Sequence, residues 1–202
     1  MKLFTILLIV LLFVACAPED DYVPTQIEPV FTTNYDREII VDIKFVISDD
    51  FNSSSLYDVN EKNLIENLNG SYFHRNNINL KLGEVGTFLN NELFDLKDDR
   101  GREKEVLKYV TVNSYNNERL TIYIIKRSNT IALGGVAISQ RALITEEKLF
   151  ESTTPHEIGH ALGLEHTRTE HNIMSEYNPN LRTEFDPFQV AIMKRTIGRI
   201  VR

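Results

Sequence analysis

Residues 156–174 read HEIGHALGLEHTRTEHNIM, and they hold four of the five histidines in the chain. On an α-helix, residues that are four apart lie one turn from each other on the same face. His156 and His160 can therefore both bind one Zn²⁺ ion through their imidazole nitrogens. Glu157 is displaced around the helix, where it can act as a general base on an attacking water without being a metal ligand.

The residues after this helical turn complete the pattern. Gly163 can adopt a positive φ angle and end the helix sharply, so that the chain doubles back and presents His166 as a third nitrogen ligand. Three protein ligands leave a fourth position open, which a catalytic zinc site requires. Met174 can supply an apolar floor beneath the imidazoles. The alternative is a plain helix with surface histidines and a glycine cap, but such a helix has no need of this spacing.

This pattern resembles the signature of the metzincin zinc metalloproteases, H-E-x-x-H-x-x-G-x-x-H followed by a methionine turn. The short interval between the third histidine and Met174 looks most like that of the matrixins, and the subfamily stays open. The resemblance implies an α+β catalytic domain, in which a mixed twisted β-sheet packs on two long helices and a C-terminal helix follows the Met-turn. It also implies one catalytic zinc ion, with His156, His160 and His166 as ligands, Glu157 as general base, Gly163 as the helix-ending turn and Met174 as the Met-turn.

The same resemblance suggests where a substrate binds. Gly135, Val136 and Ala137 fall where metzincins have the edge strand that pairs with the substrate backbone. Tyr177 and Pro179 fall where the resemblance to metzincins places a wall of the pocket that binds the substrate residue after the scissile bond. The alternative for the glycine segment is a hairpin or a bulge. The alternative for Tyr177 and Pro179 is a plain turn after the methionine.

The apolar pattern outside the quoted stretch predicts a mixed sheet with helices against it. Alternating or continuous apolar runs predict β-strands at residues 38–48, 78–82 and 120–125, and two short β pieces around Gly134 and Gly135. Helical spacing predicts a helix over residues 58–76, and residues 103–112 are expected to form a short helix or a turn.

Two prolines indicate where further helices begin. Asp186 followed by Pro187 is a favourable start for a C-terminal helix. Pro155 fits only the first turn of a helix. We therefore expect the active helix to begin between Ser152 and Thr154, with a side-chain cap from Ser152 or Thr153.

The first residues of the chain are not expected to belong to the fold. A lysine and a short apolar run lead to Phe-Val-Ala-Cys, which resembles the lipobox of bacterial lipoproteins and makes Cys16 the lipidated residue. We divide the chain into a signal peptide (1–15), the lipidated cysteine with an extended tether (16–36) and a zinc metalloprotease domain (37–202). The acidic residues after Cys16 are similar to a surface-export signal. We therefore expect a lipid-anchored protein of the bacterial cell envelope, at the outer membrane and on its surface.

Charge and composition limit the remaining classes of function. The formal net charge is −7 without any block of basic residues, which argues against nucleic acid as a partner. Acidic loops at residues 48–52 and 95–99 offer oxygen ligands to Ca²⁺, but no calcium-binding motif supports this. We expect a monomer.

The resulting hypothesis is a zinc-dependent endopeptidase that acts on proteins or peptides. The alternatives are a zinc-containing binding or adhesion lipoprotein and a processing peptidase with a very narrow substrate range. By loose resemblance to aspartate-latched metzincins, the carboxylate of Asp20, Asp21 or Asp36 is a candidate for blocking the zinc.

Overall fold

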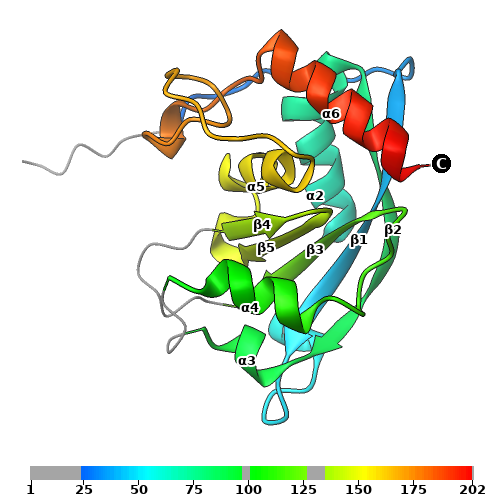
Figure 1. Ribbon diagram of the computed structural model, residues 1–202, viewed down its shortest axis with the longest axis vertical. Helices are drawn as coiled ribbons and strands as arrows, with labels where there is room; N and C mark the ends of the chain where they lie inside the picture. The colour runs from blue at the N-terminus through cyan, green and yellow to red at the C-terminus, as the bar shows by residue number, and fades with distance from the viewer. Residues whose placement is uncertain (1–23, 97–100, 127–134, 202) are drawn as a thin grey trace, which may run out of the picture.

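The computed structural model describes residues 24–96, 101–126 and 135–201, which form a five-stranded sheet with helices on both faces (Figure 1). The strand order is β2-β1-β3-β5-β4. The strands are β1 (Arg37–Ile47), β2 (Ile78–Leu89), β3 (Leu120–Ile125), β4 (Gly135–Ile138) and β5 (Arg141–Thr145). Four strands run parallel, and β4 pairs antiparallel with β5 at one edge. This mixed sheet confirms the predicted α+β class.

The strand predictions agree with the structure except near the glycine pair. The runs at 38–48 and 120–125 form β1 and β3, and the run at 78–82 is the first part of the longer β2. Gly135 begins β4 rather than forming a turn, because the turn between β4 and β5 falls at Ser139 and Gln140, where Gln140 has a φ of 61°. Gly134 lies outside the described residues.

Side chains along β3 alternate between two hydrophobic cores, because successive residues of a strand point to opposite faces. Leu120, Ile122 and Ile124 pack in the core that includes α2 (Glu61–Leu68), α5 (Thr153–Ala161) and α6 (Pro187–Ile200). Tyr123 and Ile125 pack in the other core, with α3 (Asn91–Phe94) and α4 (Glu103–Val110). The burial of β3 on both faces confirms the central strand and leaves α5 against β4 and β5 (Figure 1).

The predicted helices are present, with one irregularity. The helix expected over residues 58–76 consists of α2, a π-helical segment η2 (Asn69–Phe73) and a 3₁₀ turn η3 (His74–Asn76). The shorter helix is α4. Helix α6 begins after Asp186, whose side chain accepts a hydrogen bond from the backbone N–H of Gln189 in a capping box. No helix among the described residues is long and apolar enough to cross a membrane.

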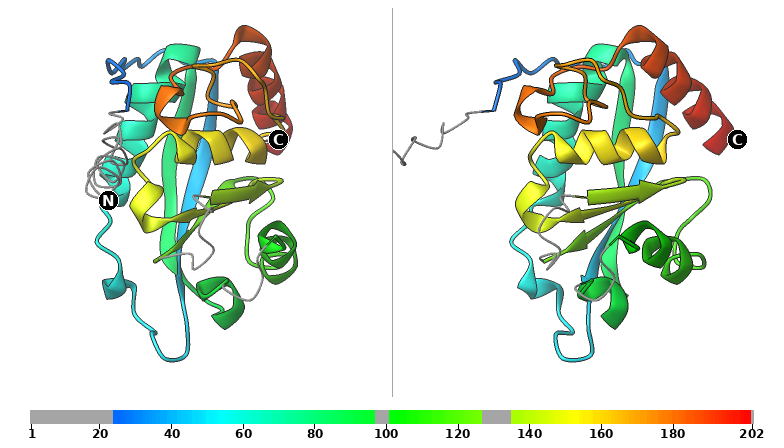
Figure 2. Two further views of the ribbon diagram at one scale, coloured as in Figure 1. Left: turned by 90° about the vertical axis from the view of Figure 1, so that its left-hand side faces the viewer. Right: turned by 60° about the vertical axis from the view of Figure 1, so that its left-hand side comes forward.

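Residues 24–36, predicted as the last part of the tether, have no regular secondary structure and lie along the domain. The backbone N–H of Thr25 donates to the carbonyl oxygen of Asn180 at 2.9 Å, and that of Val30 donates to Gly70 at 2.8 Å. The first contact ties this segment to the 3₁₀ turn η5 (Pro179–Leu181), beside which it runs in both views of Figure 2.

The carboxylate of Asp36 does not lie at the predicted zinc site. Its Oδ2 atom is 2.5 Å from Nζ of Lys194 on α6. It is therefore not the latch that the sequence suggested. The other latch candidates, Asp20 and Asp21, lie outside the described residues, as do Cys16 and the predicted signal peptide.

Candidate metal centre

Helix α5 begins at Thr153, within the predicted range, but its predicted side-chain cap is wrong. Ser152 occupies the cap position without a side-chain hydrogen bond to the helix. Its Oγ instead donates to the carbonyl oxygen of Pro179 at 2.6 Å. The hydroxyl of Thr154 donates to the carbonyl oxygen of Leu149 at 2.8 Å. Both hydroxyls therefore tie the start of α5 to neighbouring segments of the chain.

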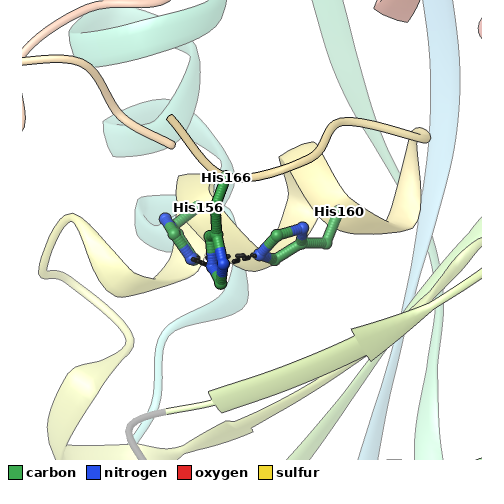
Figure 3. A group of neighbouring side chains, drawn as sticks. All are labelled: His156, His160 and His166. Carbon is green, nitrogen blue, oxygen red and sulfur yellow. Dashed lines mark hydrogen bonds between the residues drawn. The ribbon is translucent and has the colours of Figure 1, made fainter. Parts of the chain in front are cut away.

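Three imidazole rings converge on one point beside α5 (Figure 3). His156 and His160 project from the helix, and His166 reaches the same point from the segment that follows it. The Nε2 atom of His156 lies 3.1 Å from that of His160 and 3.2 Å from that of His166, and the remaining pair is 3.0 Å apart. Three nitrogens at about 2.0–2.1 Å from a tetrahedral zinc ion lie about 3.3–3.4 Å apart, so this spacing fits zinc.

The Nδ1 atoms show which ring nitrogens carry lone pairs. Nδ1 of His156 donates to the carbonyl oxygen of Ile173 at 2.7 Å, and Nδ1 of His160 donates to that of Leu164 at 2.8 Å. Because a carbonyl oxygen only accepts, Nδ1 holds the proton and Nε2 keeps the lone pair. Burial lowers the pKa of His156 to about 3 and also lowers the pKa of His160, which keeps both rings neutral. Converging lone pairs favour a cation between them, and neutral imidazoles are ligands that zinc prefers.

The third histidine has an acidic neighbour. Oε1 of Glu176 lies 3.5 Å from Nδ1 of His166. A carboxylate at Nδ1 favours the proton on that nitrogen and leaves Nε2 for a metal. No motif or spacing rule in the sequence points to Glu176, although it lies only two residues after Met174.

The structure places Gly163 at the end of α5, where its φ of 92° lies in the left-handed region that glycine adopts without strain. The backbone N–H of Gly163 donates to the carbonyl oxygen of His160 at 3.0 Å, and that of Leu164 donates to Gly159 at 2.9 Å. These bonds close the helix and reverse the chain. The reversal brings His166 back towards the two histidines on the helix.

Met174 is completely buried under the active helix. The backbone N–H of Thr167 donates to the carbonyl oxygen of Met174 at 2.9 Å, and Thr167 forms a β-bridge with Ser175. The sulfur atom lies so close to Gly159 that a Cβ atom on that glycine would overlap it. The Met-turn is thus held against the segment that carries His166 and against the helix that carries the other two histidines.

Glu157 is buried beside the histidines, with 7% of its surface exposed. Burial raises its pKa to about 7, and the positive charges of Arg182 and Lys104 act in the opposite direction. The backbone of β4 packs directly on it, because a Cβ atom on Gly135 would lie only 2.6 Å from Cγ of Glu157. A carboxyl group with this pKa can both accept and release a proton near neutral pH.

An open cleft of about 550 Å³ runs between α5 and β4. Its lining consists of Lys104, β4 with Ser139, His156, Glu157, His160 and residues 163–166. The predicted substrate-binding residues Gly135, Val136 and Ala137 belong to this lining. Among the described residues, Tyr177 and Pro179 do not: Tyr177 is 52% exposed, and Pro179 lines a separate cavity.

Converging imidazole lone pairs beside a buried carboxyl group are suited to zinc-dependent hydrolysis, and together with the mixed sheet they define a zinc metallopeptidase of the metzincin type. The sequence profile of the matrixin family matches residues 31–189. The chain belongs to this family.

The structure is similar to two solved metallopeptidases. One is metalloproteinase-II from Bacteroides fragilis, with 14% identity and a TM-score of 0.51 over 89% of this chain and 59% of that one. The other is archaemetzincin from Methanopyrus kandleri, with 14% identity and a TM-score of 0.49 over 84% of this chain and 99% of that one. No curated protein sequence matches the chain. At this identity the likeness to metalloproteinase-II supports the fold alone.

The sequence did not point to three charged residues near the centre. Lys104 comes from α4 and lines the cleft, while Arg182 and Glu176 come from the segment after the Met-turn. Each is a common surface residue type without a motif of its own, so only the fold shows its proximity to the site.

Proposed function

We propose that the chain is a zinc-dependent endopeptidase in which Glu157 is the general base. The observation that carries this proposal is the convergence of three Nε2 atoms, 3.0–3.2 Å apart, beside a buried glutamate in an open cleft. A site that only holds a metal for structural reasons has no use for a carboxyl group whose pKa is raised to about 7.

In the proposed reaction, zinc supplies Lewis-acid chemistry by lowering the pKa of water and polarising the scissile carbonyl group. The three histidines would hold this ion, and the peptide carbonyls of Ile173 and Leu164 orient two of them. The Glu157 carboxylate takes a proton from the attacking water and passes it to the departing amine. The charges of Lys104 and Arg182 favour the ionised form of Glu157 that the first of these transfers needs.

The edge position of β4 supports binding of an extended peptide. β4 pairs with β5 on one side, and its other side faces the cleft. In the described part of the chain no strand pairs with this other side, so its backbone groups can hydrogen-bond a substrate as an added strand. A groove lined by Gln140, Thr196 and Arg199 shares Ser139, His160 and Gly163 with the cleft. The groove thus continues the cleft and can bind substrate residues well beyond the scissile bond. This favours cleavage within a polypeptide over removal of its terminal residues.

The decisive experiment compares the zinc-loaded protein with its Glu157→Ala variant on a diverse peptide library. We expect cleavage at internal bonds by the parent alone, with zinc bound at one ion per chain in both proteins. Stoichiometric zinc without any cleavage by the parent would favour the binding-module alternative. Cleavage of only one or two peptides would favour the narrow processing peptidase.

The proposal includes a lipid anchor at Cys16 and a monomeric protein at the outer membrane of a bacterial cell. It is supported by the lipobox-like sequence and by the acidic residues that follow it. Fractionation of cells that express the parent and a Cys16→Ala variant tests the anchor. The parent should be found in the membrane fraction with a lipid-modified Cys16 as its N-terminus by mass spectrometry, and equal membrane association of the variant contradicts the anchor.

A further inference from the structure

A second cavity, of about 420 Å³, lies at the start of α5 on the side where η5 is found. The N-terminal segment, α2 with η2, the turn before α5 and residues 179–182 enclose it. Two contacts hold these walls together: Thr25 is hydrogen-bonded to Asn180, and Ser152 is hydrogen-bonded to Pro179. The same elements lie side by side in Figure 2.

Among the described residues, Arg182 is the only cation in the lining of this cavity. Its side chain is partly buried, and its Nε and Nη2 atoms donate to the carbonyl oxygen of Ser175 at 3.1 Å and 2.6 Å. Among the described residues no carboxylate forms an ion pair with it. The only other charged residue in the lining, Glu151, is paired with Lys148 at 3.0 Å.

A partly buried guanidinium without a direct ion pair is costly: burial lowers the pKa of Arg182, and the charge of Glu157 acts in the opposite direction. Arginine has five N–H donors in a planar fork, and two of them are used on Ser175. Nη1 and the second N–H of Nη2 lie on one edge of the fork, which matches the two oxygens of a carboxylate. The cavity therefore offers a cationic group to an incoming anion.

Arg182 also belongs to the surroundings of the metal centre. Its hydrogen-bond acceptor, Ser175, follows Met174 directly and forms a bridge with Thr167, the residue after His166. Ser152, which also lines the cavity, accepts a hydrogen bond on its carbonyl oxygen from the backbone N–H of His156 at 3.2 Å. A substrate that is cleaved at the metal centre can therefore place a side chain next to the scissile bond within reach of this guanidinium.

We propose that Arg182 is a specificity-determining residue and that the cavity it lines receives an acidic side chain, Asp or Glu, at a position adjacent to the cleaved bond. The substrate class is then acidic polypeptide segments. This inference rests on the proposed endopeptidase function and adds the chemistry of its preferred substrate.

The test uses the zinc-loaded protein and a set of peptides that differ only in Glu, Gln or Lys at each of the two positions on either side of the cleaved bond. At one of these positions we expect kcat/KM for the Glu peptide to exceed that for the Gln peptide about tenfold, because hydrogen bonds to charged groups are stronger than neutral ones. The Lys peptide should be cleaved more slowly than the Gln peptide. This order is measured in the parent and depends on no variant.

Two variants assign the preference to Arg182. Arg182→Gln removes the charge and should bring the ratio of Glu to Gln peptides close to one. Arg195→Gln removes the same charge from an exposed position on α6 and should leave the ratio unchanged. Each ratio is taken within a single preparation, so loss of folded protein or of zinc cancels.

Three outcomes overturn the inference. If the parent cleaves Glu and Gln peptides equally well at all four positions, the peptidase function stands but the acidic preference is refuted. A tenfold preference that persists in Arg182→Gln assigns the preference to another residue. If the zinc-loaded parent cleaves none of the peptides, the proposed endopeptidase function is refuted, and the inference about its specificity is refuted as well.

Discussion

Replacing Gly135 with alanine should reduce catalysis without removing zinc. A Cβ atom at this position would lie 2.6 Å from Cγ of Glu157, 2.9 Å from Cδ1 of Ile144 and 3.0 Å from the carbonyl oxygen of Leu143. None of these neighbours is a zinc-binding histidine. The Leu143 oxygen belongs to the backbone of the sheet, whereas Ile144 and Glu157 meet the new atom with their side chains. Glu157 is the nearest of the three, so its side chain must move the most.

The size of the effect follows from the required displacement. Non-bonded carbon atoms rest about 3.5–4.0 Å apart, so Cγ of Glu157 must retreat by roughly 1 Å. A misplacement of about 1 Å can cost about 100-fold in rate, which corresponds to about 2.7 kcal/mol of transition-state stabilisation. We therefore expect kcat/KM of Gly135→Ala to fall about 100-fold, with unchanged zinc stoichiometry.

The assay is the rate of hydrolysis of a fluorogenic peptide, combined with zinc content and competition against a chelator. Gly86→Ala is the matched control, because a Cβ atom on this β2 glycine meets only Nζ of Lys44, at 3.8 Å. The control should retain parental activity. Activity of Gly135→Ala within threefold of the parent, or a loss that follows loss of zinc, refutes the steric reasoning.

Three further predictions concern the histidines and the Met-turn. Glu176→Gln should weaken zinc binding about tenfold or more, because the carboxylate no longer orients His166; equal affinity in chelator competition contradicts this role. In metal-free protein, the pKa of His156 is lowered to about 3 by burial, so the unfolded chain takes up a proton below its ordinary value of 6.5 while the folded chain does not. Burial raises the pKa of Glu157 to about 7, which opposes this effect in the parent, so the measurement uses the metal-free Glu157→Gln variant. The folding stability of this variant should fall as pH decreases, by about 2 kcal/mol between pH 7 and 5, measured by urea denaturation in a chelator, and a flat profile contradicts the assignment. Met174→Ala should destabilise the protein by roughly 2–5 kcal/mol by opening a cavity against Gly159, whereas Met174→Leu should cost less than about 1.5 kcal/mol, and equal melting temperatures for the two variants refute this.

The convergence of the three histidines could be predicted because they are close in sequence. His156 and His160 lie on one helical face, and Gly163 reverses the chain within a few residues of the second histidine. Helix geometry and the backbone freedom of glycine fix these relations over short distances. The strands could be predicted for a similar reason, since apolar alternation over a few residues reflects burial of one face.

The surroundings of the site could not be predicted in the same way. Gly135 lies against Glu157 only because β4 is added as an antiparallel edge strand next to α5. The cap expected for α5 is absent because Ser152 finds an acceptor in Pro179. Both contacts join segments more than twenty residues apart, and local propensity contains no information about such pairs.

The sequence by itself determined the identity and order of the three converging histidines, the end of the active helix and the alternation that builds the sheet. These features depend on interactions between residues that are neighbours along the chain. Only the tertiary structure decided which charged groups act on the site. Arg182, Lys104 and Glu176 are ordinary polar residues in sequence, and they become relevant because folding places them near Glu157 or His166. The physical reason is that electrostatic and steric effects depend on distance in space, and the fold alone sets that distance.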